Sequence, residues 1–393
     1  MQHPPLFADD VAAMPQAVNS AFDRYAKRLP AIFVPLLERL TIVERVAIEA
    51  NRSISELAEM FDANEAALRN LLLPIPPSVV ALPAVGRTGD SSATAAAETE
   101  CGARGDETGI RDPDAAYTSV ETLVAHLARD WSEMGAVPRA RTYRPLLRAL
   151  GTLQRERRRP LRIFVPGAGA GRLAWEVAQR GHRVEANDAS AVMLIAARAI
   201  IGGPHDRSWR LFPRAGCAGG LAPRASCRCA ADISLPTSRG AANGAAAQAG
   251  RLTLHVGSWC SDAHGARRNA SFDAVVTSYF LDALPDPAAA VRTVRRLLRP
   301  GGVWLNVGPL HWHHPAAGML RLTLDELLAL IALHGFARVD SRRLGAVPYL
   351  VSGAGRERWP WPWRRRTWRQ PAPLEDEWHD VVLWVARVPQ AEV

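Results

Sequence analysis

The sequence has one lysine, few cysteines and no long apolar run. Lys27 is the only lysine among 48 basic residues, so arginine supplies nearly all of the positive charge behind the formal net charge of +9. The arginines are scattered along the 393 residues and do not form one basic stripe. Such a replacement of lysine more often reflects codon usage than a phosphate-binding surface, and a patch is what attracts nucleic acid. We therefore expect no nucleic-acid partner.

The five cysteines are too few for a disulfide framework in a chain of this length. Cys217, Cys227 and Cys229 lie close together but lack the paired spacing of a zinc site, so no metal is expected. No stretch of 18 apolar residues occurs, which excludes a membrane-spanning helix. Asp9 and Asp10 stand where a signal peptide would be apolar. These features predict a cytoplasmic protein, with the nucleus also open, and no membrane partner.

What is present is a 48% hydrophobic composition, enough to bury a core. Residues 1–73 are predicted to form a helical region, because apolar positions recur every three or four residues and Ser53 is placed to begin a helix. Residues 74–117 lose this periodicity and are predicted to be a disordered linker. Residues 118–393 are predicted to form the main domain. Its low-complexity insertion at 202–250 is expected to be dispensable.

The main domain alternates apolar strand patterns with helical ones. Strands are predicted at 161–166, 182–188, 252–256, 272–277, 303–307, 337–342 and 381–387. Helices are predicted from 118 onward to about 132 and at 143–150, 172–180, 190–200, 287–298 and 325–334. Such alternation predicts an α/β fold, a doubly wound and mostly parallel Rossmann-like sheet of seven strands preceded by helices. The last strand is expected to insert antiparallel.

A glycine loop follows the first of these strands and opens a helix. Gly167, Gly169 and Gly171 let the backbone approach a ligand, and the helix start offers free N–H groups to an anion. The next strand ends in Asp188, where a carboxylate can accept hydrogen bonds from both hydroxyls of a ribose. Dinucleotide enzymes share this arrangement. The G-x-G-x-G spacing and the Arg-Pro-Gly-Gly turn at 299–302 favour S-adenosylmethionine over NAD as the cofactor.

Several motifs of this chain occur together in one enzyme family. They are V-P-G-A-G-A-G-R at 165–172, N-D-A-S at 187–190, R-D-W-S at 129–132 and W-L-N-V-G-P at 304–309. Through them the chain resembles the carnosine N-methyltransferase family of S-adenosylmethionine-dependent methyltransferases, from about residue 17 to 388 outside the two low-complexity segments. The resemblance implies methyl transfer to an imidazole nitrogen of a histidine-containing dipeptide such as carnosine, giving anserine.

The resemblance also implies which residues bind the cofactor. They are His126, Arg129, Gly167, Gly169, Gly171, Asp188, Ser258, Trp259 and Ser278. His126 stands where the family has glutamine and Asp188 where it has glutamate, and both side chains can still form hydrogen bonds. Ser258 and Trp259 replace an aspartate and a phenylalanine. The carboxylate that would hold the adenine amino group is therefore missing, which predicts weaker cofactor binding.

On the acceptor side the resemblance implies Asp282 and His313 as the catalytic pair, with Tyr349 and Trp378 also binding the substrate. Neutral imidazole is a competent nucleophile near pH 7, because its unperturbed pKa is about 6.5. A carboxylate on the far ring nitrogen would select the tautomer and stabilise the imidazolium that forms, which suits Asp282. His313 would position the ring or the substrate backbone. A simple helix-capping role for Asp282 stays open.

Three further interpretations stay open. The acceptor could be a histidine of a protein or another small molecule. The chain could also be an inactive methyltransferase-fold module that binds partners, because Ser258 and the residues around Trp378 depart from the family pattern.

The histidines at 311–314 are too closely spaced after a strand to converge on one metal ion. The expected partner is a small histidine-containing peptide, and a homodimer is not excluded.

Overall fold

The computed structural model describes residues 50–72, 113–203, 207–215, 229–236, 251–257, 259, 269–312, 320–351 and 378–390. The predictions for residues 17–49, for most of the linker at 74–117, for Ser258 and for His313 lie outside this part of the chain. No helix within these ranges is both long enough and apolar enough to cross a membrane.

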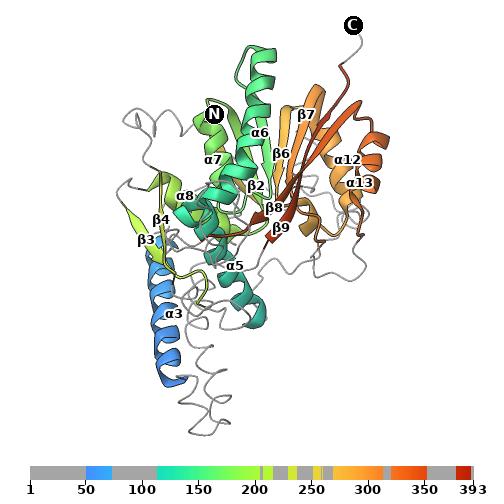
Figure 1. Ribbon diagram of the computed structural model, residues 1–393. Helices are drawn as coiled ribbons and strands as arrows, with labels where there is room; N and C mark the ends of the chain where they lie inside the picture. The colour runs from blue at the N-terminus through green and yellow to red at the C-terminus, as the bar shows by residue number, and fades with distance from the viewer. Residues whose placement is uncertain are drawn as a thin grey trace, which may run out of the picture.

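A seven-stranded sheet forms the centre of the fold (Figure 1). Its strands are β1 (Arg162–Pro166), β2 (Arg183–Asp188), β5 (Leu252–Val256), β6 (Phe272–Ser278), β7 (Leu298–Gly308), β8 (Arg338–Pro348) and β9 (Trp378–Arg387). They lie in the order β5-β2-β1-β6-β7-β9-β8. The first five strands of that order are parallel, and β9 runs antiparallel between β7 and β8. This confirms the predicted α/β sheet and its inserted last strand.

Helices cover both faces of the sheet. They are α6 (Ala136–Arg157), α7 (Arg172–Gln179), α8 (Ala191–Gly202), α12 (Pro287–Leu297) and α13 (Leu324–Leu333). Because side chains alternate along a strand, β1 directs Ile163 and Val165 into the cluster under α6 and α7, and Phe164 into the cluster under α12 and α13. The parallel strands are therefore buried on both sides, as their continuous apolar runs require.

Two of these helices, α8 and α13, begin at clear side-chain caps. The Ser190 hydroxyl accepts a hydrogen bond from Met193 N–H at the start of α8. Thr323 and Glu326 form a reciprocal capping box at the start of α13. The sequence therefore located these two helix starts well, since a capping side chain is a local signal.

Other boundaries differ from the sequence-based expectations. Helix α3 (Ala50–Leu72) already contains Ser53, and α5 (Pro113–Trp131) begins inside the segment predicted as linker. Helix α6 is much longer than the predicted 143–150. The residues predicted as a turn at 299–302 belong to β7, which Gly301 enters with a φ of +68°. Periodicity locates a helix or strand better than it locates its ends, because end residues have few neighbours to pack against.

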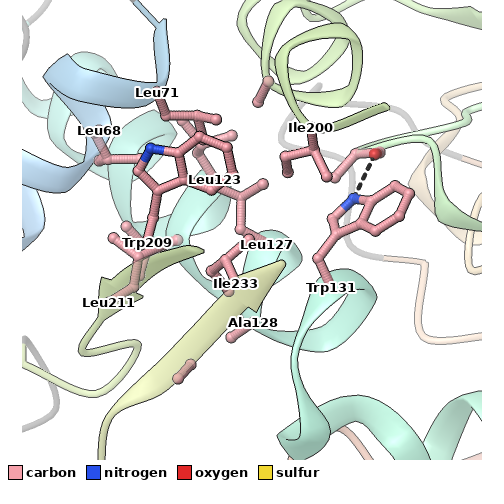
Figure 2. Packing of buried hydrophobic residues seen from close by; sticks show 14 of the residues in the cluster. Leu68, Leu71, Leu123, Leu127, Ala128, Trp131, Ile200, Trp209, Leu211 and Ile233 are labelled. Carbon is pink, nitrogen blue, oxygen red and sulfur yellow. Dashed lines mark hydrogen bonds between the residues drawn. The ribbon is translucent and has the colours of Figure 1, made fainter. Parts of the chain in front are cut away.

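A third apolar cluster lies beside the sheet and corrects one prediction. Part of the insertion at 202–250 is folded: β3 (Ser208–Leu211) and β4 (Ala231–Ser234) form an antiparallel pair. Its buried side chains pack against leucines of α3 and α5, as Figure 2 shows. The set includes Trp209, Leu211, Ile233, Leu68, Leu71, Leu123 and Leu127. The prediction that the whole insertion is dispensable is therefore wrong, because it supplies core to two helices.

Hydrogen bonds fasten this pair of strands to α3. The fully buried Asn64 amide donates to the carbonyl of Phe212 at 2.9 Å and accepts from the Phe212 N–H at 2.6 Å. The Trp209 indole donates to the Asn70 side-chain oxygen at 3.1 Å. One asparagine thus satisfies both backbone groups of Phe212, as a neighbouring strand would.

Replacement of Asn64 by alanine should destabilise the protein, because it leaves the Phe212 N–H without its partner and removes one of the two hydrogen bonds to the Phe212 C=O, which also accepts from the Ala215 N–H. A buried polar group that loses its partner costs about 1–3 kcal/mol, so we expect a loss in that range. Denaturant unfolding would measure the loss. Glu65→Ala is the matched control on the same helix: it removes only the partly exposed ion pair with Arg69 and should cost about 0.3–0.5 kcal/mol. Equal effects of the two substitutions would contradict the anchoring role.

Candidate functional site

The candidate site lies where the strand order reverses. The chain passes from β1 to β2 on one side, while β6 and β7 lie on the other side of β1. In doubly wound sheets the crevice at the carboxyl ends of such strands binds the ligand. Here the glycine loop follows β1, Asp188 ends β2 and Ser278 ends β6. The fold therefore brings together three segments that the sequence singled out separately.

The glycine loop has a backbone that only glycine adopts easily. Gly167, Gly169 and Gly171 have φ angles of +62°, +53° and +82°. A Cβ on Gly169 would lie 3.1 Å from Nδ1 of His126, and one on Gly167 would overlap the ring of Phe280. Any other residue at these positions would have a strained backbone, and its Cβ would meet the neighbouring side chains. The loop therefore forms a cradle that a side chain would fill.

Asp188 holds this loop against the end of β2. Its Oδ2 accepts the Gly169 N–H at 2.7 Å, and its Oδ1 accepts the Ser190 N–H at 2.9 Å. Burial raises the pKa of Asp188, while these two hydrogen bonds oppose the rise. The carboxylate therefore lies at the loop, where the sequence placed it for binding ribose hydroxyls.

Helix α5 is fixed to the same loop. The Trp131 indole donates a hydrogen bond to the carbonyl of Ala170 at 2.8 Å, drawn as a dashed line in Figure 2. From the first turn of α7, Arg172 donates to the carbonyl of Asp130 at 2.9 Å. These contacts hold the C-terminal end of α5, which carries His126 and Arg129, beside the loop.

Arg129 joins the predicted cofactor residues to the predicted substrate residues. Its side chain is 7% exposed, and its guanidinium carbon lies 4.2 Å from the ring centroid of Tyr279 and 5.1 Å from that of Tyr349. These are cation–π contacts, which gain strength where water is excluded. The structure therefore places Tyr349, predicted on the acceptor side, directly beside Arg129.

His126 is a neutral imidazole inside the crevice. Its pKa is lowered to about 4, chiefly by desolvation and also by the positive charge of Arg129, while Asp130 opposes the change. Its ring lies 6.4 Å from that of Tyr349. The crevice thus disfavours positive charge on a bound imidazole.

The remaining described cofactor residues lie on the β6 side. Trp259 is buried, with its ring 5.5 Å from that of Phe280, which covers Gly167. The Ser278 hydroxyl is buried and finds no partner among the residues that the structure describes. A glycine cradle, a carboxylate, an arginine, an aromatic pair and an unsatisfied hydroxyl fit S-adenosylmethionine, which carries a ribose, an adenine and an amino-acid end. Ser258 lies outside the described residues, so its contact stays a prediction.

On the acceptor side Asp282 lies in the short helix η4 (Leu281–Ala283) and is 1% exposed. Its Oδ2 accepts the main-chain N–H of His311 at 3.0 Å, which fixes the loop after β7. Trp378 is 40% exposed at the start of β9. The roles predicted for Asp282 and Trp378 stay predictions, as does that of His313 beyond the described ranges.

Sequence reasoning missed four residues of the site. Phe280 covers the glycine loop, and the Tyr279 hydroxyl is buried without a partner in the described part of the chain. Burial raises the pKa of Tyr279 to about 12. The ring of His379 lies 5.7 Å from both Tyr279 and Tyr349, and its Nδ1 is 3.3 Å from Nδ1 of His311. The position of Tyr279 just after β6 was a usable signal, whereas His379 reaches the site only through the register of β9.

The structure also bears on the metal question. Within the described ranges, no three side chains of the types that bind metals converge on one point. His311 turns toward His379 of β9, while His313 and His314 lie outside the described residues.

Comparison with known proteins identifies the family of this chain. Residues 110–354 match the family described as Carnosine N-methyltransferase. The carnosine N-methyltransferase of Mus musculus is 26% identical over 232 residues, which cover 55% of this chain and 54% of that protein. That of Schizosaccharomyces pombe is 26% identical over 237 residues, covering 55% and 61%. The chain thus spans little more than half the length of these curated relatives.

Solved structures resemble the chain less closely. A SAM-dependent methyltransferase of Methanosarcina mazei is 16% identical, covers 59% of this chain and 93% of its own, and has a TM-score of 0.34. The assignment therefore depends on the sequence match, which extends over most of the crevice, from α5 through the glycine loop to Tyr349. Since that match includes more than half of the residues, the chain belongs to the carnosine N-methyltransferase family.

Proposed function

We propose that this protein is an S-adenosylmethionine-dependent N-methyltransferase that acts on the imidazole of a histidine-containing dipeptide such as carnosine, giving anserine. The observation that carries the proposal is the family match over residues 110–354. That range contains the glycine loop, Asp188, Arg129 and Asp282, which the fold gathers at one edge of the sheet. The crevice chemistry described above supports it.

The cofactor, when bound, supplies a methyl group activated by a positively charged sulfur. The glycine loop and Asp188 would hold its nucleoside part, and Arg129 would lie beside its amino-acid end. The chain must then present a neutral imidazole with its lone pair toward the methyl group. The positive charge of Arg129, which contributes to the lowered pKa of His126, would disfavour protonation of an acceptor imidazole bound beside it, and a neutral imidazole is nucleophilic.

Asp282 would supply the negative charge on the acceptor side. During transfer the acceptor ring gains positive charge, and a fixed carboxylate nearby stabilises that charge most at this moment. Asp282 is suited to this role because it is buried and its Oδ2 is held by the His311 N–H. It cannot turn away without breaking that hydrogen bond.

The test is a methyl-transfer assay with labelled S-adenosylmethionine and a panel of acceptors. The panel contains carnosine, other histidine dipeptides, free histidine and a peptide with an internal histidine. We expect labelled anserine from carnosine, identified by mass spectrometry. Transfer only to the internal histidine would favour a protein substrate, and cofactor binding without transfer to any acceptor would favour a binding module.

Gly169→Ala should weaken cofactor binding at least tenfold, measured by calorimetric titration with S-adenosylmethionine. The added Cβ would lie 3.1 Å from His126 at a φ of +53°, so the loop must shift where the backbone meets the ligand. Gly151→Ala is the matched control: a Cβ there meets nothing within 4 Å in α6 and should stabilise the helix by about 0.5–1 kcal/mol. If Gly169→Ala binds S-adenosylmethionine as tightly as the wild type, the loop is not part of the cofactor site.

Asp282→Asn should lower kcat by about 10²–10³-fold with the cofactor Kd little changed, because it keeps the shape and removes the charge. Steady-state kinetics on carnosine and a binding titration measure the two effects. Asp286→Ala is the control for a capping role, since Asp286 caps α12 and the substitution removes that cap. If Asp282→Asn keeps more than half of the wild-type rate, the carboxylate is structural.

A further inference from the structure

Two histidines that the proposed mechanism does not use form a pair at the mouth of the crevice. His311 lies in the loop after β7, and His379 lies near the start of β9. Their Nδ1 atoms are 3.3 Å apart and their ring centroids 4.9 Å apart, with the planes tilted by 39°. The pair comes from segments 68 positions apart in the sequence, so only the fold creates it.

The two rings differ in their surroundings. Nε2 of His379 is buried, and its ring packs edge-on against Tyr279 and Tyr349, the two tyrosines whose rings Arg129 contacts. His311 is exposed to solvent. The pair therefore extends from the buried crevice to water.

A hydrogen bond between two imidazoles requires a proton on one Nδ1 and a lone pair on the other. Each ring can accept a proton on one nitrogen and release one from the other, which makes histidine a proton carrier near neutral pH. Two rings joined through their Nδ1 atoms can thus move a proton from one outer nitrogen to the other without either ring leaving its place.

We propose that His379 and His311 form a proton relay that carries the proton of the methylated acceptor out of the crevice. The proposal rests on the proposed function. The imidazole nitrogen forms its bond to the methyl carbon as the carbon–sulfur bond breaks, and that electron pair stays on sulfur. The N–H proton of the resulting imidazolium passes to Nε2 of His379, the Nδ1 proton of His379 passes to Nδ1 of His311, and His311 releases its Nε2 proton to water.

After the product leaves, exchange with water in the open crevice restores the starting tautomers. Both rings are neutral before and after each turnover, so the relay consumes nothing. The net result is one methyl group transferred and one proton delivered to solvent.

The charges around the crevice explain why the proton must leave. The positive charge of Arg129, which contributes to the lowered pKa of His126, also disfavours positive charge on an acceptor ring bound beside it. The charged and titratable groups around the pair are Arg129 and His126 from α5, Arg141 from α6, Tyr279 and Asp282 after β6, Tyr349 after β8 and Asp380 of β9. Asp282 accepts the main-chain N–H of His311 and so fixes the loop that carries the outer ring.

His311→Gln separates a relay from a structural contact. Glutamine can still form a hydrogen bond to Nδ1 of His379, but it cannot pass a proton on. We expect kcat on carnosine to fall about tenfold or more in dilute buffer, since positioned proton transfer commonly contributes more than this. Concentrated proton-accepting buffer at constant pH and ionic strength should restore the rate, because a buffer base reaches His379 from solvent. The wild-type rate should not depend on buffer concentration.

Two further measurements complete the test. His334→Gln, at the C-cap of α13, is the matched control and should keep the wild-type rate and its independence of buffer. Nitrogen NMR of the imidazoles should show one protonated and one unprotonated Nδ1 in the wild type, as a hydrogen bond between the two rings requires.

The possible outcomes distinguish a failure of the relay from a failure of the proposed function. Turnover by the wild type together with a buffer-insensitive His311→Gln of normal rate overturns the relay and leaves the proposed function standing. A slow His311→Gln that buffer does not restore assigns His311 a structural role and also overturns the relay. Absence of transfer to every histidine acceptor by the wild type overturns both.

Discussion

The hydrogen bond from the Trp131 indole to the Ala170 carbonyl is the contact on which the crevice depends. Ala170 lies inside the glycine loop, so this bond fixes the loop to the end of α5. Together with the hydrogen bond from Arg172 to the Asp130 carbonyl, it sets where His126 and Arg129 lie relative to the loop, because α5 is not attached to any strand of the central sheet by a short turn. The loop and the helix are thus positioned as one unit, which matters because a ligand site needs its contacting groups held to fractions of an ångström.

This dependence explains why the insertion is part of the core. Trp131 and Ala170 belong to the same apolar cluster as β3, β4 and α3. The strands of the insertion pack on the far side of α5 from the loop, and Asn64 fastens them to α3. Removing them would expose the leucines of α5 and free the helix that carries Arg129. The strands of the insertion do not belong to the candidate site. They support it by packing against α5, the helix that carries Arg129.

The sequence was enough to predict the central sheet and the segments expected to bind the cofactor. It was not enough to predict which residues gather on the side expected to bind the methyl acceptor. Strand patterns, glycines and caps are local signals, so β1, the loop and the end of β2 could be placed in advance. His379 could not, because its position depends on how β9 inserts between β7 and β8, with Ala346 opposite Asp380 and a register shift near Gly345. The four-residue strands β3 and β4 were missed for a similar reason, since so short a segment shows no period.

The arrangement of charge in the crevice follows from the same geometry. Arg129 contacts the rings of both Tyr279 and Tyr349, which lie edge to face with each other, and it pairs with Asp130 at 3.9 Å. Asp188 lies at the glycine loop and Asp282 lies in η4 after β6, so carboxylates occur on both the predicted cofactor side and the predicted acceptor side of this cation. A ligand with a positive centre meets Arg129 unfavourably unless its charge is being transferred away or neutralised. The crevice is consequently suited to a reaction in which positive charge passes from one side to the other and then leaves as a proton.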